Sequence, residues 1–254
     1  MIDLHCHLLP NIDDGSRSVE QSAAVLREFA KAGITDVVLT PHLASGSIQV
    51  EGEVALERRA GAFQILRAGA PAAPRLALGF EIMLDQPLPV LAVGDRRYSL
   101  AGSRYYLVEF HPTIVAGFAA TVLQQMARAG AVPIVAHPER DDACNPTVVA
   151  EWRRVGAKIQ VDATTLTRPH SRGRRARAIL EGGLADVLAA DNHGDYRSLA
   201  AAARYLEGRG AGRAITRLTE QNPGAVIRDA DMAPVDPVRL PERWVERVMR
   251  FFRG

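Results

Sequence analysis

The sequence predicts an α/β fold in which seven parallel strands close into a barrel. Short apolar runs alternate with longer segments of helical periodicity, and side chains that can bind metal directly follow several of the apolar runs. Repeated strand–helix units indicate a parallel sheet. Barrel sites gather at the C-terminal ends of many strands, whereas an open sheet places its site at one switch point. The spread of these side chains over many strand ends therefore favours the barrel.

The expected elements follow one another in regular order along the chain. The predicted strands are 2–6, 35–40, 75–80, 105–109, 132–136, 158–162 and 186–190, and the predicted helices lie near 18–32, 51–70, 116–130, 145–156, 172–182 and 196–209. The first helix has a start signal at Ser16 or Ser18. Gly130, Gly156 and Gly183 mark the ends of later helices before the next strand.

Length and composition indicate one domain, residues 1–254, because no linker, internal repeat or low-complexity segment interrupts the pattern. The net charge of +2 is too small to indicate nucleic acid or a membrane surface as a partner. Without a signal segment or an apolar stretch long enough to span a bilayer, we expect a cytoplasmic protein. Residues 241–253 are predicted to form an amphipathic terminal helix that either packs on the barrel or docks a partner, and the oligomeric state stays open.

The candidate metal ligands are all imidazoles and carboxylates that follow apolar runs or open the chain. They are His5, His7, Asp14, His42, Glu81, Glu109, His137, Asp191 and His193. A strand delivers residues i and i+2 to one face, so His5 and His7 can bind as a pair. Capping or a core hydrogen bond would explain one or two of these positions but not the whole set. The pattern predicts a multinuclear metal site in a hydrolytic enzyme.

The donor types restrict the metal and the chemistry. Histidine nitrogen and carboxylate oxygen suit manganese, iron, zinc or magnesium. The chain has no cysteine pair at metal spacing, which argues against a closed structural zinc site. Neither Cys6 nor Cys144 is followed by arginine at the spacing of a cysteine-phosphatase loop, since Ile12 and Ala150 stand there. We expect Cys6 to be buried and inert, because it points away from His5 and His7.

Several motifs together resemble the PHP (polymerase and histidinol phosphatase) superfamily. They are His5-Cys6-His7, Asp13-Asp14-Gly15, Thr40-Pro41-His42, Glu81, Glu109-Phe110, His137-Pro138-Glu139-Arg140 and Asp191-Asn192-His193. Within the superfamily, the opening motif and the Ala-His-Pro-Glu-Arg element are similar to bacterial manganese-dependent protein-tyrosine phosphatases of capsule and exopolysaccharide loci. The resemblance implies a distorted, TIM-like (β/α)7 barrel with three divalent metals, expected to be Mn²⁺ with Fe, Zn or Mg as alternatives, at the C-terminal ends of its strands.

The resemblance also implies an arrangement of ligands. His5, His7, Glu81 and Asp191 would hold the first metal; Glu81, Glu109 and His137 the second; and Asp14, His42 and His193 the third. Either aspartate of the Asp13-Asp14 pair could be the ligand, and motif alignment selects Asp14. Asp3 is expected to support the strand end or the ligands, whereas His111 and His170 are left outside the set.

Two arginines resemble the family's phosphate-binding pair, namely Arg140 and Arg197. A guanidinium can hold two phosphate oxygens at once. Arg197 is the weaker assignment, because the loop Gly194-Asp195-Tyr196 before it differs in length from the family pattern. The basic stretch 168–177 would lie near the same mouth, where it either steers a phosphorylated peptide or is simply solvated.

The resemblance implies hydrolysis of phosphotyrosine on an autophosphorylating tyrosine kinase that controls capsule or exopolysaccharide assembly. One rival is a small-molecule phosphoesterase on the same scaffold, such as a histidinol-phosphate phosphatase. Another is a regulator that docks a kinase without hydrolysing it. An amidohydrolase acting on C–N bonds is disfavoured, because its usual bridging lysine is not evident.

Overall fold

The fold is built from short parallel strands with helices around them, as seen in a computed structural model that describes residues 1–110 and 116–241. The strands are β1 (Ile2–Cys6), β2 (Asp36–Leu39), β3 (His42–Ala44), β4 (Arg75–Leu78), β5 (Glu81–Leu84), β6 (Tyr105–Phe110), β7 (Val132–Val135), β8 (Lys158–Asp162) and β9 (Val187–Ala189). They pair in the orders β1-β2-β4 and β3-β5-β6-β7-β8-β9.

Two strand pairs run on into one another, and this joins the two sheets. Two residues separate β2 from β3, and two separate β4 from β5, and the pairing of β2 with β4 continues beyond these breaks as the pairing of β3 with β5. Between β9 and β1 the backbone amides of Asp191 and His7 donate to His5 and Asn192, at 3.0 and 2.8 Å. Asp3, which is buried, accepts from the amide of Ala190 on the same side. Hydrogen bonds thus lead from strand to strand around the ring and back to β1.

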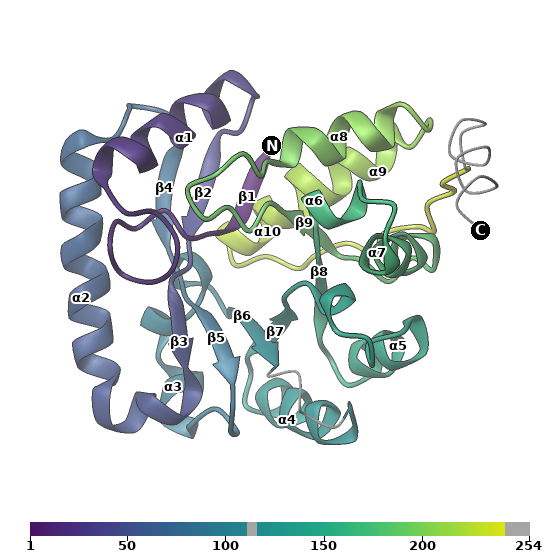
Figure 1. Cartoon of the computed structure of the whole chain (residues 1–254). Helices are drawn as coiled ribbons and strands as arrows, with labels where there is room; N and C mark the ends of the chain where they lie inside the picture. Colours follow the sequence, from purple (N-terminus) through teal and green to yellow (C-terminus); the bar gives the residue numbers. More distant parts are fainter. Residues whose placement is uncertain (111–115, 242–254) are drawn as a thin grey trace.

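The helices occupy the periphery of the strands (Figure 1). They are α1 (Val19–Lys31), α2 (Ile48–Gly69), α3 (Val90–Gly94), α4 (Ala116–Arg128), α5 (Pro146–Arg154), α6 (Ala163–Leu166), α7 (Ser171–Glu181), α8 (Leu199–Glu207), α9 (Gly212–Thr216) and α10 (Asn222–Ile227). Short 3₁₀ turns are η1 (Ser45–Ser47), η2 (Arg96–Tyr98), η3 (Leu100–Gly102) and η4 (Pro138–Arg140), and η5 (Arg217–Gln221) is π-helical. Within the described ranges, none of the helices has the length and apolar character needed to cross a bilayer.

The predicted α/β fold with parallel strands is confirmed, and all the predicted strands are present. The strands predicted over 35–40 and 75–80 are present as β2 and β4, whereas β3 and β5, which follow them after a break, were not predicted. Pro41, at the first break, has no amide hydrogen to donate to a ladder. The helix predicted from residue 196 begins instead at Leu199, with Ser198 as its N-cap. Ser18 caps α1 as expected, its Oγ accepting from the amide of Gln21.

A bulge in β1 sets which side chains face the interior of the ring. Three residues of β1 advance against two of β2, from the pair Asp3–Val37 to the pair Cys6–Leu39. Leu4 packs with Val38 and with side chains of β6, β7 and β9, strands spread around the ring, so this cluster lies inside it. Cys6 belongs to the larger cluster formed with the helices. Bulges commonly re-aim side chains beside active sites, and here the bulge turns His5 and His7 inward above the apolar cluster.

Candidate metal centre

All the predicted ligands except His137 fall into three overlapping groups in which the ligand atoms lie within 4.8 Å of one another. The groups are His5, His7, Glu81 and Asp191; His7, Asp14, His42 and His193; and His42, Glu81 and Glu109. His5 and Glu109 lie near the ends of β1 and β6, His42 and Glu81 open β3 and β5, and the others follow β1 or β9. Residues far apart in the sequence therefore meet where β1, β6 and β9 end and where β3 and β5 begin, just beyond β2 and β4.

The innermost group is fully buried and lacks hydrogen bonds that its carboxylates need. Glu81 Oε2 lies 3.1 and 3.2 Å from Nε2 of His5 and His7, and Asp191 Oδ1 lies 3.2 and 3.3 Å from the same two nitrogens. Both oxygens are buried without a hydrogen-bond partner among the described residues. Leaving such groups unsatisfied is costly. Two carboxylate oxygens and two imidazole nitrogens converging in this way fit a divalent cation between them.

The imidazoles of His5 and His7 are held from behind by two further polar side chains. Nδ1 of His5 lies 3.0 Å from Oε1 of Gln160, and Nδ1 of His7 lies 2.7 Å from Oδ2 of Asp13. An oxygen acceptor at Nδ1 places the ring hydrogen there and leaves the Nε2 lone pair free for a metal. The geometry therefore gives Asp13 an orienting role and leaves Asp14 as the ligand-type aspartate of the pair.

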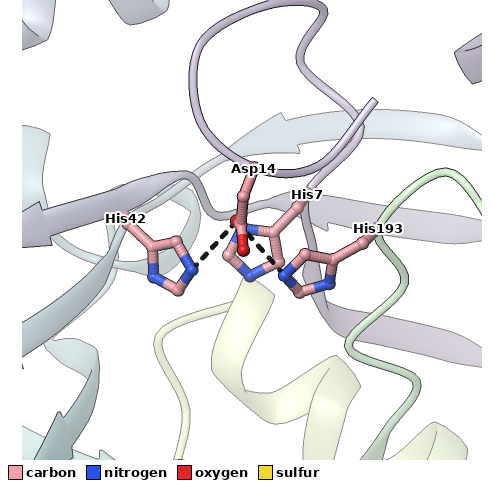
Figure 2. Close-up of side chains that lie close together, drawn as sticks. All are labelled: His7, Asp14, His42 and His193. Carbon is pink, nitrogen blue, oxygen red and sulfur yellow. Dashed lines mark ion pairs between the residues drawn. The ribbon is translucent and has the colours of Figure 1, made fainter. Parts of the chain in front are cut away.

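The outer group is more open and centres on Asp14. Figure 2 shows Asp14 reaching between the rings of His42 and His193, with His7 beside them. Its Oδ1 lies 3.4 Å from Nε2 of both rings. The turn that carries Asp14 packs so tightly on β1 that a Cβ at Gly15 would lie 2.1 Å from the carbonyl oxygen of His7. Glycine is therefore required there for Asp14 to reach the site.

The third group differs from the arrangement that the resemblance implied. Nδ1 of His42 lies 3.1 Å from Glu81 Oε2 and 3.5 Å from Glu109 Oε1. His137 contacts the other oxygen of Glu81, at 2.8 Å, and is not in a group with Glu109. In this structure His42, rather than His137, accompanies the two glutamates. His137 as a ligand thus stays a prediction.

Electrostatics show that the cluster needs positive charge. Burial alone would lower the pKa of His5, but Glu81 and Asp191 outweigh it and raise that pKa to about 9. Burial would raise the pKa of Glu81 and of Asp191, yet the surrounding imidazoles hold both well below the usual range. The pKa of Glu109 is raised by its burial and by Glu81. Protons or a cation must balance these carboxylates, and a divalent ion would do so without protonating the ligands.

Two of the predicted ligands have unusual backbone conformations. The φ angles of His137 and Asp191 are 32° and 48°, in the left-handed region that residues other than glycine seldom adopt. Such strain typically persists at sites where a side chain must be held in one place. His137 and Asp191 each lie two residues beyond the end of a strand, β7 and β9, so the turn directs each side chain at the cluster.

The two predicted phosphate-binding arginines meet at the same carboxylate. One guanidinium nitrogen of Arg140 contacts Oδ2 of Asp191 and also lies 2.5 Å from Oδ2 of Asp162. Nη1 of Arg197 lies 3.3 Å from the same oxygen of Asp191, and its Nε donates to Asp195. Arg197 therefore lies at the same cluster as Arg140.

Sequence reasoning missed two buried residues of β8 that support the site. Gln160 orients His5, and Asp162 holds Arg140. Both alternate with the apolar residues Ile159 and Val161, so polar side chains at every second position of a buried strand were the available signal. Because the run was interpreted only as a strand, its polar face was overlooked.

The remaining candidates lie outside the cluster. His170 is exposed at the start of α7, and Cys6 and Cys144 are buried, with burial raising the pKa of both thiols. His111 and most of the predicted terminal helix (241–253) lie outside the described residues.

Comparison with known proteins places this site in a family context. The model of a family described as capsular polysaccharide synthesis, CpsB/CapC, matches residues 1–228. The tyrosine-protein phosphatase CpsB of Streptococcus pneumoniae is 29% identical over 204 residues, which are 76% of this chain and 83% of that protein. The tyrosine-protein phosphatase YwqE of Bacillus subtilis is 28% identical over 198 residues, 76% of this chain and 77% of that protein.

A solved structure agrees over nearly the whole chain. It comes from work on YwqE from Bacillus subtilis and CpsB from Streptococcus pneumoniae, described as metal-dependent tyrosine phosphatases. It superposes with a TM-score of 0.77 at 25% identity, covering 96% of this chain and 100% of that chain. Since the family model spans almost all of the described residues, the chain belongs to the CpsB/CapC family.

Proposed function

We propose that this protein is a metal-dependent protein-tyrosine phosphatase. The observation that carries the proposal is the buried group in which oxygens of Glu81 and Asp191 that have no hydrogen-bond partner among the described residues face the oriented imidazoles of His5 and His7. Arg140 and Arg197 lie beside that group and supply guanidinium charge for a phosphate. Relatives named as tyrosine-protein phosphatases support the same activity.

The ligand set supports three divalent ions, with manganese as the preferred metal. The first would be held by His5, His7, Glu81 and Asp191, and the third by Asp14, His42 and His193, with His7 also in reach. Glu81 would be shared with the second, which Glu109 and His137 would complete. His42 is an additional donor there, because it lies close to both glutamates. Carboxylates at Asp14 and Glu109 favour hard ions.

The chain's own residues would bind the phosphate and orient the ligands. When bound, divalent ions of such a cluster neutralise phosphate charge and supply a water activated for attack on phosphorus. Arg140 and Arg197 would hold phosphate oxygens, while Gln160 and Asp13 keep the Nε2 atoms of His5 and His7 aimed at the cluster. The leaving tyrosine phenolate, with a pKa of about 10, places less demand on a general acid than an alkoxide does.

The proposed substrate is phosphotyrosine on a protein, specifically on an autophosphorylating tyrosine kinase that controls capsule or exopolysaccharide assembly. The family's description as capsular polysaccharide synthesis supports this setting. A cytoplasmic location, as expected from the sequence, belongs to the same proposal.

Phosphate release from a phosphotyrosine peptide and from histidinol phosphate, measured side by side with manganese and with chelator, tests the function. The proposal predicts chelator-sensitive turnover with a larger kcat/KM on the peptide. A larger kcat/KM on histidinol phosphate would instead indicate that the protein is a small-molecule phosphoesterase that uses the same metal site. Binding of the peptide without hydrolysis of either substrate would indicate a docking regulator.

A further inference from the structure

We propose that a rim composed of Arg168, Arg172 and Tyr196 binds acidic side chains that flank the phosphotyrosine of the substrate. The proposal rests on the proposed function, because it assigns a peptide class to the same site. Arg168 and Arg172 belong to the basic stretch 168–177, and Tyr196 lies in the loop between His193 and Arg197. Nη2 of Arg168 donates to Oη of Tyr196 at 3.2 Å, so the two segments meet.

The basic stretch is anchored next to the candidate phosphate-binding residues. Arg175 donates from Nε to the carbonyl of Glu139, the residue before Arg140, at 2.8 Å. Its Nη1 also lies 2.7 Å from Asp142. Arg177 donates to the carbonyls of Leu166 and Arg168, at 3.1 and 2.9 Å. Two of the arginines therefore fix the position of α7 and of the turn before it, at the side of the metal centre that carries Arg140.

The loop that carries Tyr196 is fixed by a buried side chain. Nδ2 of Asn192 donates to the carbonyls of Asp195 and Arg197, at 3.0 and 2.6 Å, and its Oδ1 accepts from the amide of Gly194. Tyr196 is nevertheless 80% exposed. A large aromatic ring is thus held in solvent beside Arg197. Tyrosine and arginine commonly dominate the energy of interfaces.

The rim has positive charge to offer a ligand. Over residues 1–110 and 116–241, no carboxylate forms an ion pair with Arg168 or Arg172, although Arg140, Arg175 and Arg197 are all paired with aspartates. Arg172 lies three residues before Arg175, which places both on one side of α7. A peptide whose phosphotyrosine entered the metal centre would extend over this rim. Acidic flanking residues would complement its charge.

Arg174 provides a matched control on the same helix. It is exposed like Arg172 but lies two residues further on, which rotates it by about 200° around the helix axis. Loss of either guanidinium changes the net charge equally. A difference in peptide binding between Arg172→Gln and Arg174→Gln would therefore report a contact made by the rim and not the change in net charge.

The test compares manganese-loaded wild-type protein with the variants Arg172→Gln, Arg174→Gln, Tyr196→Ala and Tyr196→Phe. Substrates are phosphotyrosine peptides of one length with acidic, neutral or basic flanks, and p-nitrophenyl phosphate, which is too small to reach the rim. Arg172→Gln is expected to raise KM for the acidic peptide about two- to fivefold with kcat unchanged, because an exposed ion pair contributes little more than that. The effect should shrink at high salt. Tyr196→Ala is expected to raise the same KM, and Tyr196→Phe to retain most of the affinity.

Arg174→Gln and all values for p-nitrophenyl phosphate should match wild type. The proposed rim would be contradicted if wild-type protein showed no preference for acidic flanks. It would also be contradicted if Arg174→Gln raised KM for the acidic peptide as much as Arg172→Gln does. Absence of turnover on every phosphate ester would instead overturn the proposed function. In that case, anisotropy measurements of the labelled acidic phosphopeptide bound to the same variants would still decide whether the rim binds it.

Discussion

At the scale of single residues, adjacent aspartates have different environments and should have separable roles. Asp13 contacts the far nitrogen of His7, whereas Asp14 reaches the rings of His42 and His193. The residue pattern alone left Asp13 and Asp14 equivalent, because either carboxylate of a turn can point inward, and only the family resemblance selected Asp14. In the structure, the backbone path enforced by Gly15 distinguishes them.

We predict that Asp14→Asn lowers the number of manganese ions bound per chain, because a ligand of the outer group is lost. Asp13→Asn should keep the stoichiometry but weaken affinity by roughly 10- to 100-fold, the usual cost of losing an orienting partner. Metal analysis after dialysis and calorimetric titration measure the two quantities. An Asp13→Asn protein that loses an ion while Asp14→Asn retains it would reverse the assignment.

Arg140 and Asp162 should behave as one unit. Removal of Arg140 by Arg140→Ala is expected to lower kcat/KM on phosphotyrosine peptide by about 100-fold, the loss typical of one charged donor at a transition state. Asp162→Asn should lower it less, because the guanidinium remains but is held less firmly. Asparagine retains an oxygen for the cap of α6 that Asp162 provides.

A double-mutant cycle measures this coupling. The double variant should be little worse than Arg140→Ala alone, since Asp162 would act through Arg140. If the losses of transition-state free energy from the two single variants added fully, and each variant kept the wild-type melting temperature, Asp162 would act independently of the arginine.

At the scale of elements, the strands were predictable because most of them are short runs rich in apolar residues that lie between segments of helical periodicity. The interruptions at Pro41 and Gly79 were less evident, since β3 and β5 continue the same strands beyond the break. The bulge in β1 was not predictable from alternation, because it depends on pairing with β2. The short elements α9, η5 and α10 carry little periodicity of their own and fold by packing against the ring.

The parallel pair β2–β4 contains an ion pair that should make stability depend on pH. Partial burial tends to raise the pKa of Asp36, but hydrogen bonds from Arg75 and Thr35 outweigh it and lower that pKa below its usual value. A carboxyl with a lowered folded pKa contributes stability that is fully present above its unfolded pKa of about 4 and is lost as pH falls through the folded value.

Urea unfolding of metal-free protein between pH 2 and pH 7 tests this expectation. Asp36→Asn should be less stable than wild type above about pH 4, and the difference should disappear at the acidic end. Asp236→Asn, at an exposed carboxylate of the tail, is the control and should show no such change. A difference that is constant over the whole range would contradict a role for the ionised pair.

At the scale of the whole molecule, the metal centre joins strand ends from around the ring, so its occupancy should stabilise the entire fold. Each ion at a hundredfold excess over its Kd adds about 2.7 kcal/mol. For a chain of this size that corresponds to a rise in Tm of roughly 5 to 10 °C per ion. Scanning calorimetry with manganese and with chelator measures the rise.

The variant Asp191→Asn is the control for this effect. It removes a ligand of the buried group and should respond less to manganese than wild type does. Equal Tm values for wild-type protein in manganese and in chelator would contradict a resident metal centre.

The most direct measurement is phosphate release from a phosphotyrosine peptide by metal-stripped protein as manganese is added back, with bound metal counted in the same samples. The account predicts no turnover without metal and activity that rises with occupancy to about three ions per chain, and little recovery in Asp191→Asn. Turnover that persists in chelator, or fully loaded protein that releases no phosphate, would contradict it.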